Sequence, residues 1–135
     1  MSLLQREESR VISGPVSLFE GLTLLEAAKQ PERYRALFRL EPGSPVLSGH
    51  FPGHPILPGI AHLALALQGA REIEGFGVEL LSLHGVRFRN PVRPEDTDEL
   101  IVVRGARPGA LRFEVRRGET IASSGILVVG DHARG

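Results

Sequence analysis

The residues best able to do chemistry gather in one stretch, SGHFPGHPILPGIAHLALALQ, at positions 48–68. Two histidines, His50 and His54, stand there among closely spaced prolines and glycines. A neutral imidazole, with an unperturbed pKa of about 6.5, can accept a proton near physiological pH. Their spacing could also suggest a metal pair, but Pro52 and Gly53 exclude the helix that would align both rings. His50 is therefore a candidate acid–base residue or a loop-capping one, and His54 is expected on a surface loop.

Other catalytic patterns are absent from the sequence. There is no cysteine, which excludes disulfides, zinc–thiolate sites and thiol nucleophiles. There is also no Gly-x-Ser-x-Gly turn, no His-Glu-x-x-His helix and no glycine-rich phosphate loop. We expect no cofactor and no metal.

Composition and charge indicate one globular domain over residues 1–135. Sixteen basic residues balance sixteen acidic ones, so no net field favours nucleic acid or an anionic membrane surface. The longest mostly apolar stretch, residues 56–67, is too short to span a bilayer. The N-terminal residues do not resemble a signal peptide. A cytoplasmic protein is the expectation.

The elements that must position the histidines begin with one helix. Pro58 suits the first helical position, where a missing N–H is not needed. The pattern predicts a helix from residue 60 to about residue 73, ending near Gly75. Because this segment is apolar nearly all round through Leu67, we expect it to be buried.

Strands account for most of the remaining sequence. Residues 1–14 are expected to form a loosely ordered lead-in, and residues 22–28 suit either a helix or a short strand. Further strands are predicted over residues 33–40, 80–91, 100–104, 110–116 and 120–129. The expected fold class is α+β, with one long central helix wrapped by a curved antiparallel sheet.

Two motifs carry a resemblance to a known family. The segment GHFPGHPILPGI, residues 49–60, and the segment VRFRNPVRPED, residues 86–96, resemble signatures of the 3-hydroxyacyl-[acyl-carrier-protein] dehydratases of fatty-acid and polyketide synthesis. The resemblance covers roughly residues 33–129. Residues 1–32 lack the family's usual His-Arg-Tyr-Pro opening.

The resemblance implies a hot-dog fold and a homodimer with two active sites at the subunit interface. In that family the histidine at the position of His50 works against an acidic residue on the other subunit's helix. The first helical amides, here near Gly59, hold the thioester carbonyl. The implied substrate is an acyl chain linked through phosphopantetheine to acyl carrier protein.

One position departs from the family pattern. The family's catalytic carboxylate falls on Ala64, which has no proton to give. His62 is a possible alternative acid, but it lies about 200° around the helix from Ala64. Gln68 lies on the same face as Ala64, about 40° away, but an amide cannot act as an acid. Substrate contacts are expected from Phe51, Pro58, Ala64 and Gln68.

Several alternatives stay open on sequence alone. His62 could be a hydrogen-bonded core residue instead of a catalyst. Arg87, Arg89 and Arg93 suit either the acidic carrier protein and its phosphate or a solvated strand face. As a whole, the chain could be a dehydratase, a hot-dog acyl thioesterase, or a non-catalytic acyl-binding subunit that forms a heterodimer with a related chain.

Overall fold

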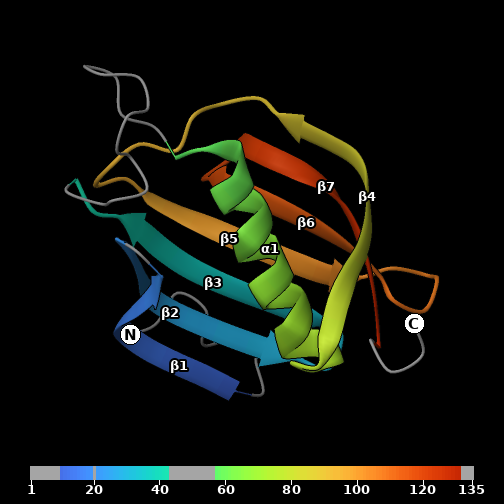
Figure 1. The fold of residues 1–135 in the computed structure, drawn as a ribbon. Coiled ribbons are helices and arrows are strands. Elements are labelled where there is room, and N and C mark those ends of the chain that lie inside the picture. Colours follow the sequence, from blue (N-terminus) through green and yellow to red (C-terminus); the bar gives the residue numbers. More distant parts are fainter. Residues whose placement is uncertain (1–9, 20, 43–56, 132–135) are drawn as a thin grey trace.

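The computed structural model describes residues 10–19, 21–42 and 57–131. This part of the chain contains seven strands and one helix (Figure 1). In chain order they are β1 (Arg10–Phe19), β2 (Leu22–Gln30), β3 (Arg33–Leu40), α1 (Gly59–Glu74), β4 (Val78–Phe88), β5 (Thr97–Arg104), β6 (Ala110–Arg117) and β7 (Thr120–Asp131).

The strands form a single antiparallel sheet in the order β1-β2-β3-β5-β6-β7-β4. The helix lies across one face of this curved sheet, as Figure 1 shows. Within the described sheet, the strand that follows the helix, β4, pairs only with β7 and forms one edge, while β1 forms the other. The predicted α+β class, with a helix wrapped by an antiparallel sheet, is confirmed.

The predicted helix is also confirmed. It starts at Gly59, directly after Pro58, whose ψ of 151° is extended and not helical. It ends at Glu74, and Gly75 follows with a φ of 111°, a conformation that favours glycine. The amide of Gly75 donates to the carbonyl of Arg71 at 2.8 Å and closes the last turn.

Two segments near the N-terminus differ in detail from the expectation. Residues 22–28, which suited either a helix or a strand, belong to β2. The expected loose lead-in over residues 1–14 is wrong for its last part, because β1 begins at Arg10 and pairs with β2 from Arg10 opposite Lys29. Backbone pairing to β2 stabilises this segment, whereas Gly14 and Pro15 obscure its strand pattern. Residues 1–9 lie outside the described part.

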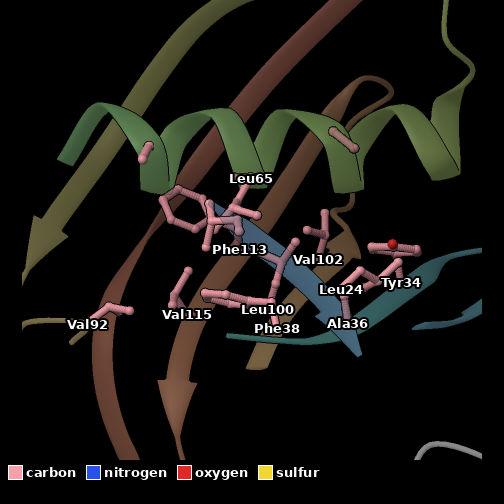
Figure 2. Packing of buried hydrophobic residues seen from close by; sticks show 14 of the residues in the cluster. Leu24, Tyr34, Ala36, Phe38, Leu65, Val92, Leu100, Val102, Phe113 and Val115 are labelled. Atoms are coloured by element: carbon pink, nitrogen blue, oxygen red, sulfur yellow. The ribbon is translucent and has the colours of Figure 1, made fainter. Parts of the chain in front are cut away.

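The core lies between the helix and the sheet. In β3, Tyr34, Ala36, Phe38 and Leu40 are buried and alternate with partly exposed residues, which is the alternation expected of a half-buried strand. Figure 2 shows Leu65 of α1 above side chains from β5 and β6 in this cluster.

Gly69 allows the helix to lie directly on the sheet. A Cβ atom added at Gly69 would lie 2.6 Å from Cγ2 of Val102 and 3.2 Å from side-chain atoms of Leu100 and Tyr34. At the other end of the helix, the amide of Leu57 donates to the carbonyl of Val92 at 2.8 Å. These contacts fix the helix start beside the loop that follows β4.

Candidate active site at the start of the helix

The helix begins without the usual capping groups. Pro58 offers no side-chain hydrogen bond, and the first turn contains no acidic residue. The amide of Ala61 donates to the carbonyl of Pro58 at 3.0 Å. Among the described residues, no capping side chain and no first-turn carboxylate offsets the partial positive charge of this helix N-terminus, which can stabilise negative charge on a bound group.

Phe88 covers this helix start. A Cβ atom added at Gly59 would lie 3.0 to 3.4 Å from the Phe88 ring, so the glycine permits the ring to pack against the helix backbone. Phe88 is the last residue of edge strand β4 and is still 53% exposed. The helix start thus has an apolar wall on one side.

His62 lies in the core, where its ring contacts Ser123 and Phe88. It is 3% exposed, and its Nδ1 lies 2.7 Å from Oγ of the buried Ser123. Its ring meets that of Phe88 edge to face, with centroids 5.4 Å apart. Burial lowers the pKa of His62 to about 4, despite a hydrogen bond to the backbone of Leu57 that raises it. The imidazole is neutral near pH 7, and its contacts favour the interpretation as a hydrogen-bonded core residue.

Ala64 and Gln68 occupy the opposite side of the helix from the sheet. Ala64 is exposed, Gln68 is half-buried, and Ile60 on the same face is 73% exposed. The residues that face the sheet are Ala61, His62, Leu65, Ala66, Gly69 and Ala70. The prediction that His62 and Ala64 face different directions is therefore confirmed.

Of the other predicted site residues, the structure describes some and not others. Pro58 and Gly59 form the helix start described above. His50 and Phe51 lie outside the described residues, as do His54 and the prolines between them and Leu57.

The predicted arginines separate into two groups. Arg87 and Arg89 line a hollow on the face of the sheet opposite the helix, whereas Arg93 is exposed and does not line it.

A buried carboxyl group was not singled out from the sequence. Asp98 on β5 lies opposite Phe38 of β3 and is 3% exposed. Its Oδ2 has no hydrogen-bond partner among the residues that the structure describes. Burial, with a contribution from Asp96, raises its pKa to about 6, although Arg117 lowers it. The polar run Thr97-Asp98-Glu99 resembles a solvated strand start, so only the strand alternation around Leu100 and Val102 could have indicated that Asp98 faces the core.

Exposed apolar side chains gather at the β4 edge of the sheet, near the helix start. Besides Ile60 and Phe88, Leu81 of β4 is 64% exposed and Leu80 is 37% exposed. Phe76, just before β4, is 69% exposed. Edge strand β4 and the helix face that carries Ala64 therefore offer a surface suited to a second protein chain.

This arrangement is that of the hot-dog proteins. It matches a chain of the dehydratase heterocomplex ApeI:P from Xenorhabdus doucetiae with a TM-score of 0.68 and 24% identity, over 86% of this chain and 97% of that one. It also matches the (R)-hydratase from A. caviae involved in PHA biosynthesis with a TM-score of 0.61 and 20% identity, over 85% and 98% of the two chains. The chain therefore has a hot-dog fold.

Sequence comparison gives the family. Residues 26–126 match the ApeI-like family, described as ApeI dehydratase. The 3-hydroxyacyl-[acyl-carrier-protein] dehydratase FabZ of Campylobacter curvus is 34% identical over 61% of this chain and 62% of the relative. The FabZ of Aliarcobacter butzleri is 32% identical over 71% of each chain. The chain belongs to the ApeI-like family of dehydratases, and the resemblance to 3-hydroxyacyl-[acyl-carrier-protein] dehydratases is confirmed.

In residues 10–19, 21–42 and 57–131, no helix has the length and apolar character needed to cross a membrane.

Proposed function

We propose that this protein dehydrates a 3-hydroxyacyl thioester that acyl carrier protein presents on its phosphopantetheine arm, producing a 2-enoyl thioester and water. The observation that carries this proposal is the helix start at Gly59, which lies in the family motif that contains His50 and is covered by Phe88. No capping side chain among the described residues occupies it. The names of the FabZ relatives support the same reaction.

His50 is the proposed base. It would take the proton from C2 of the acyl chain, and the electron pair left on C2 would form the C2–C3 double bond as the C3–oxygen bond breaks. A histidine suits this step because its unperturbed pKa lies near the working pH. Pro52, Pro55 and Pro58 limit the conformations of the segment between His50 and the helix, which reduces the entropy lost on ordering it.

The helix start is the proposed site for the thioester carbonyl. Negative charge develops on the carbonyl oxygen as the C2 proton leaves. Amides at a helix N-terminus stabilise such charge, and no first-turn carboxylate opposes it here. The expected substrate contacts of Phe51, Pro58, Ala64 and Gln68 stay part of this proposal.

The leaving hydroxyl group needs a proton that residue 64 cannot give. Ala64 has no ionisable group, and His62 is buried with a pKa of about 4. Two donors remain in this mechanism: His50, which then holds the proton taken from C2, or an acidic side chain of a second hot-dog chain. The proposed assembly is accordingly a homodimer, or a heterodimer with a related chain, formed along β4 and the exposed helix face.

The test is the interconversion of 3-hydroxybutyryl and crotonyl thioesters by four proteins: wild type, His50→Ala, Ala64→Glu and the double variant. We expect His50→Ala to abolish activity while the far-ultraviolet spectrum stays unchanged. If the site lacks only its acid, Ala64→Glu should raise the rate at least about tenfold, because general acid catalysis typically contributes 10²–10⁴-fold. The double variant should lose that gain.

Each result that would contradict the proposal points to a different explanation. Full activity of His50→Ala would remove His50 from the mechanism. A fast wild type that Ala64→Glu slows would mean that His50 moves both protons. Acyl-thioester binding without turnover in all four proteins would favour the non-catalytic partner subunit.

A further inference from the structure

A basic hollow lies on the face of the sheet that the helix does not cover. Residues on or next to β4, β5, β6 and β7 line it, and its volume is about 550 Å³. The residues that define this groove are Arg87, Arg89, Ile101, Val103, Arg112, Glu114, Arg116 and Ile126. It is open to solvent and not enclosed.

The shape of the groove follows from an irregularity in β4. The register between β4 and β7 shifts between His84 and Arg87. Gly85 lies in this interval with a φ of 58°, and a Cβ atom there would have no neighbour within 4 Å. A β-bulge of this kind changes where the next side chains point. The rim at Gly85 therefore stays open, and Arg87 lies opposite Ser124 on the groove side.

Positive charge is concentrated here, although the whole chain has a formal net charge of zero. Four arginines line the groove against one carboxylate, Glu114, which pairs with Arg116 at 3.2 Å. Arg87, Arg89 and Arg112 form no side-chain hydrogen bond or ion pair with any residue in the part of the chain that the structure describes. These three guanidinium groups are available to an external acceptor.

Apolar side chains form the floor of the groove and limit which kinds of partner would fit it. Ile101 and Val103 lie on the groove side of β5, whereas Leu100 and Val102 face the core. Ile126 of β7 is 36% exposed beside Arg112, its neighbour in the β6–β7 pair. A nucleic acid backbone would use the arginines but would gain nothing from this floor. A small anion would be poorly enclosed in an open hollow.

We propose that this groove is a docking site for an acidic helical segment of a partner protein, one that presents carboxylates on either side of an apolar side chain. Guanidinium groups form paired hydrogen bonds with carboxylates, and the apolar side chain would bury Ile101, Val103 and Ile126. The groove is separate from the helix start at Gly59, which lies on the other face of the sheet.

The test uses a fluorescein-labelled 18-residue helical peptide with glutamates four residues apart around leucines, and the same peptide with glutamines. Fluorescence anisotropy at 50 mM salt should give micromolar binding of the glutamate peptide and at least tenfold weaker binding of the glutamine peptide. Binding should weaken at 300 mM salt. The double variant Arg87→Ser with Arg112→Ser should lose at least tenfold in affinity. The double variant Arg93→Ser with Arg107→Ser, which removes the same charge outside the groove, should lose less than twofold.

Equal binding of both peptides, or no loss in the groove variant, would overturn the proposal. So would competition by inorganic phosphate or by an 18-nucleotide single strand at concentrations below those of the peptide. Turnover of a small thioester by the groove variant, measured in parallel, keeps this result separate from the proposed activity, because none of the groove residues belongs to the proposed catalytic site.

Discussion

Two buried ionisable side chains, His62 and Asp98, make the stability of the folded protein depend on pH in opposite directions. His62 has a folded-state pKa of about 4 against a usual 6.5, so the unfolded chain binds a proton first as the pH falls. Asp98 has a folded-state pKa of about 6 against a usual 3.8, so the folded chain binds a proton first. Stability from the His62 contribution is therefore lost on acidification from pH 6.5 towards 4, while the Asp98 contribution rises from pH 6 towards 4.

In the wild type, the two contributions to the pH dependence of the free energy of unfolding should largely cancel. We therefore expect each single variant to reveal the contribution of the residue that remains. With Asp98→Asn, the free energy of unfolding should fall by roughly 1–3 kcal/mol between pH 6.5 and 4. With His62→Gln, it should rise by roughly 1–3 kcal/mol over the same range. Urea denaturation at several pH values measures both slopes, and Glu119→Gln, at an exposed turn position, is the control. Identical slopes in the two variants would contradict the opposed contributions.

At the scale of single elements, the contact between α1 and β5 sets how the helix start is presented. Gly69 lies so close to Val102 that even a methyl group would overlap it. A larger residue there would lift the helix or move the strand, and both changes would displace Gly59 relative to Phe88. The close contact at Gly69 thus affects the position of the candidate site, because the helix connects the two rigidly.

Gly69→Ala should lower the free energy of unfolding by about 1–2 kcal/mol, because overpacking costs more than the gain in helix propensity. Val102→Ala makes room for the added methyl group. A double-mutant cycle should therefore show a favourable coupling of about 1 kcal/mol or more between the two substitutions. Gly77→Ala, where an added Cβ has no neighbour within 4 Å, should change stability by less than about 0.5 kcal/mol. Additive effects of Gly69→Ala and Val102→Ala would argue against this contact.

The elements differ in how far the sequence could predict them. The helix was predictable because Pro58 and Gly75 bound a continuous apolar segment, and β3 because its alternation is regular. β1 was not, because Gly14 and Pro15 interrupt its pattern and its backbone pairing with β2 is what forms the strand. Within the candidate site, the opposed directions of His62 and Ala64 follow from helix geometry alone. The burial of Asp98 follows from its alternation with Leu100 and Val102, a signal that the polar run Thr97-Asp98-Glu99 obscures.

For the whole molecule, the exposed edge at β4 is the feature on which the proposed assembly depends. Leu81 and Phe88 leave apolar surface beside unpaired backbone groups, and Ile60 continues this surface onto the helix. An edge of this kind associates with a second chain unless charge or proline protects it. The proposed two-chain site requires that association.

The protein should therefore sediment as a dimer at micromolar concentration, alone or with its related chain. Leu81→Arg should weaken the dimer at least about tenfold, because it places a charge on the apolar edge. Thr120→Arg, at the exposed start of β7, adds the same charge elsewhere and should leave the dimer intact. Sedimentation velocity over a dilution series distinguishes the two variants. A monomeric wild type would count against a shared site.

The position of β4 in the sheet also has a consequence for synthesis of the chain. β4 spans Val78–Phe88, yet its only partner in the described sheet is β7, which ends at Asp131. As the chain leaves the ribosome, β4 emerges with Leu80 and Leu81 and has no strand to pair with until β5, β6 and β7 have followed. Long-range pairing of this kind slows folding. The edge strand along which we propose assembly is thus the described strand that stays unpaired longest after it emerges, and it is there that chaperone contact or premature association would begin.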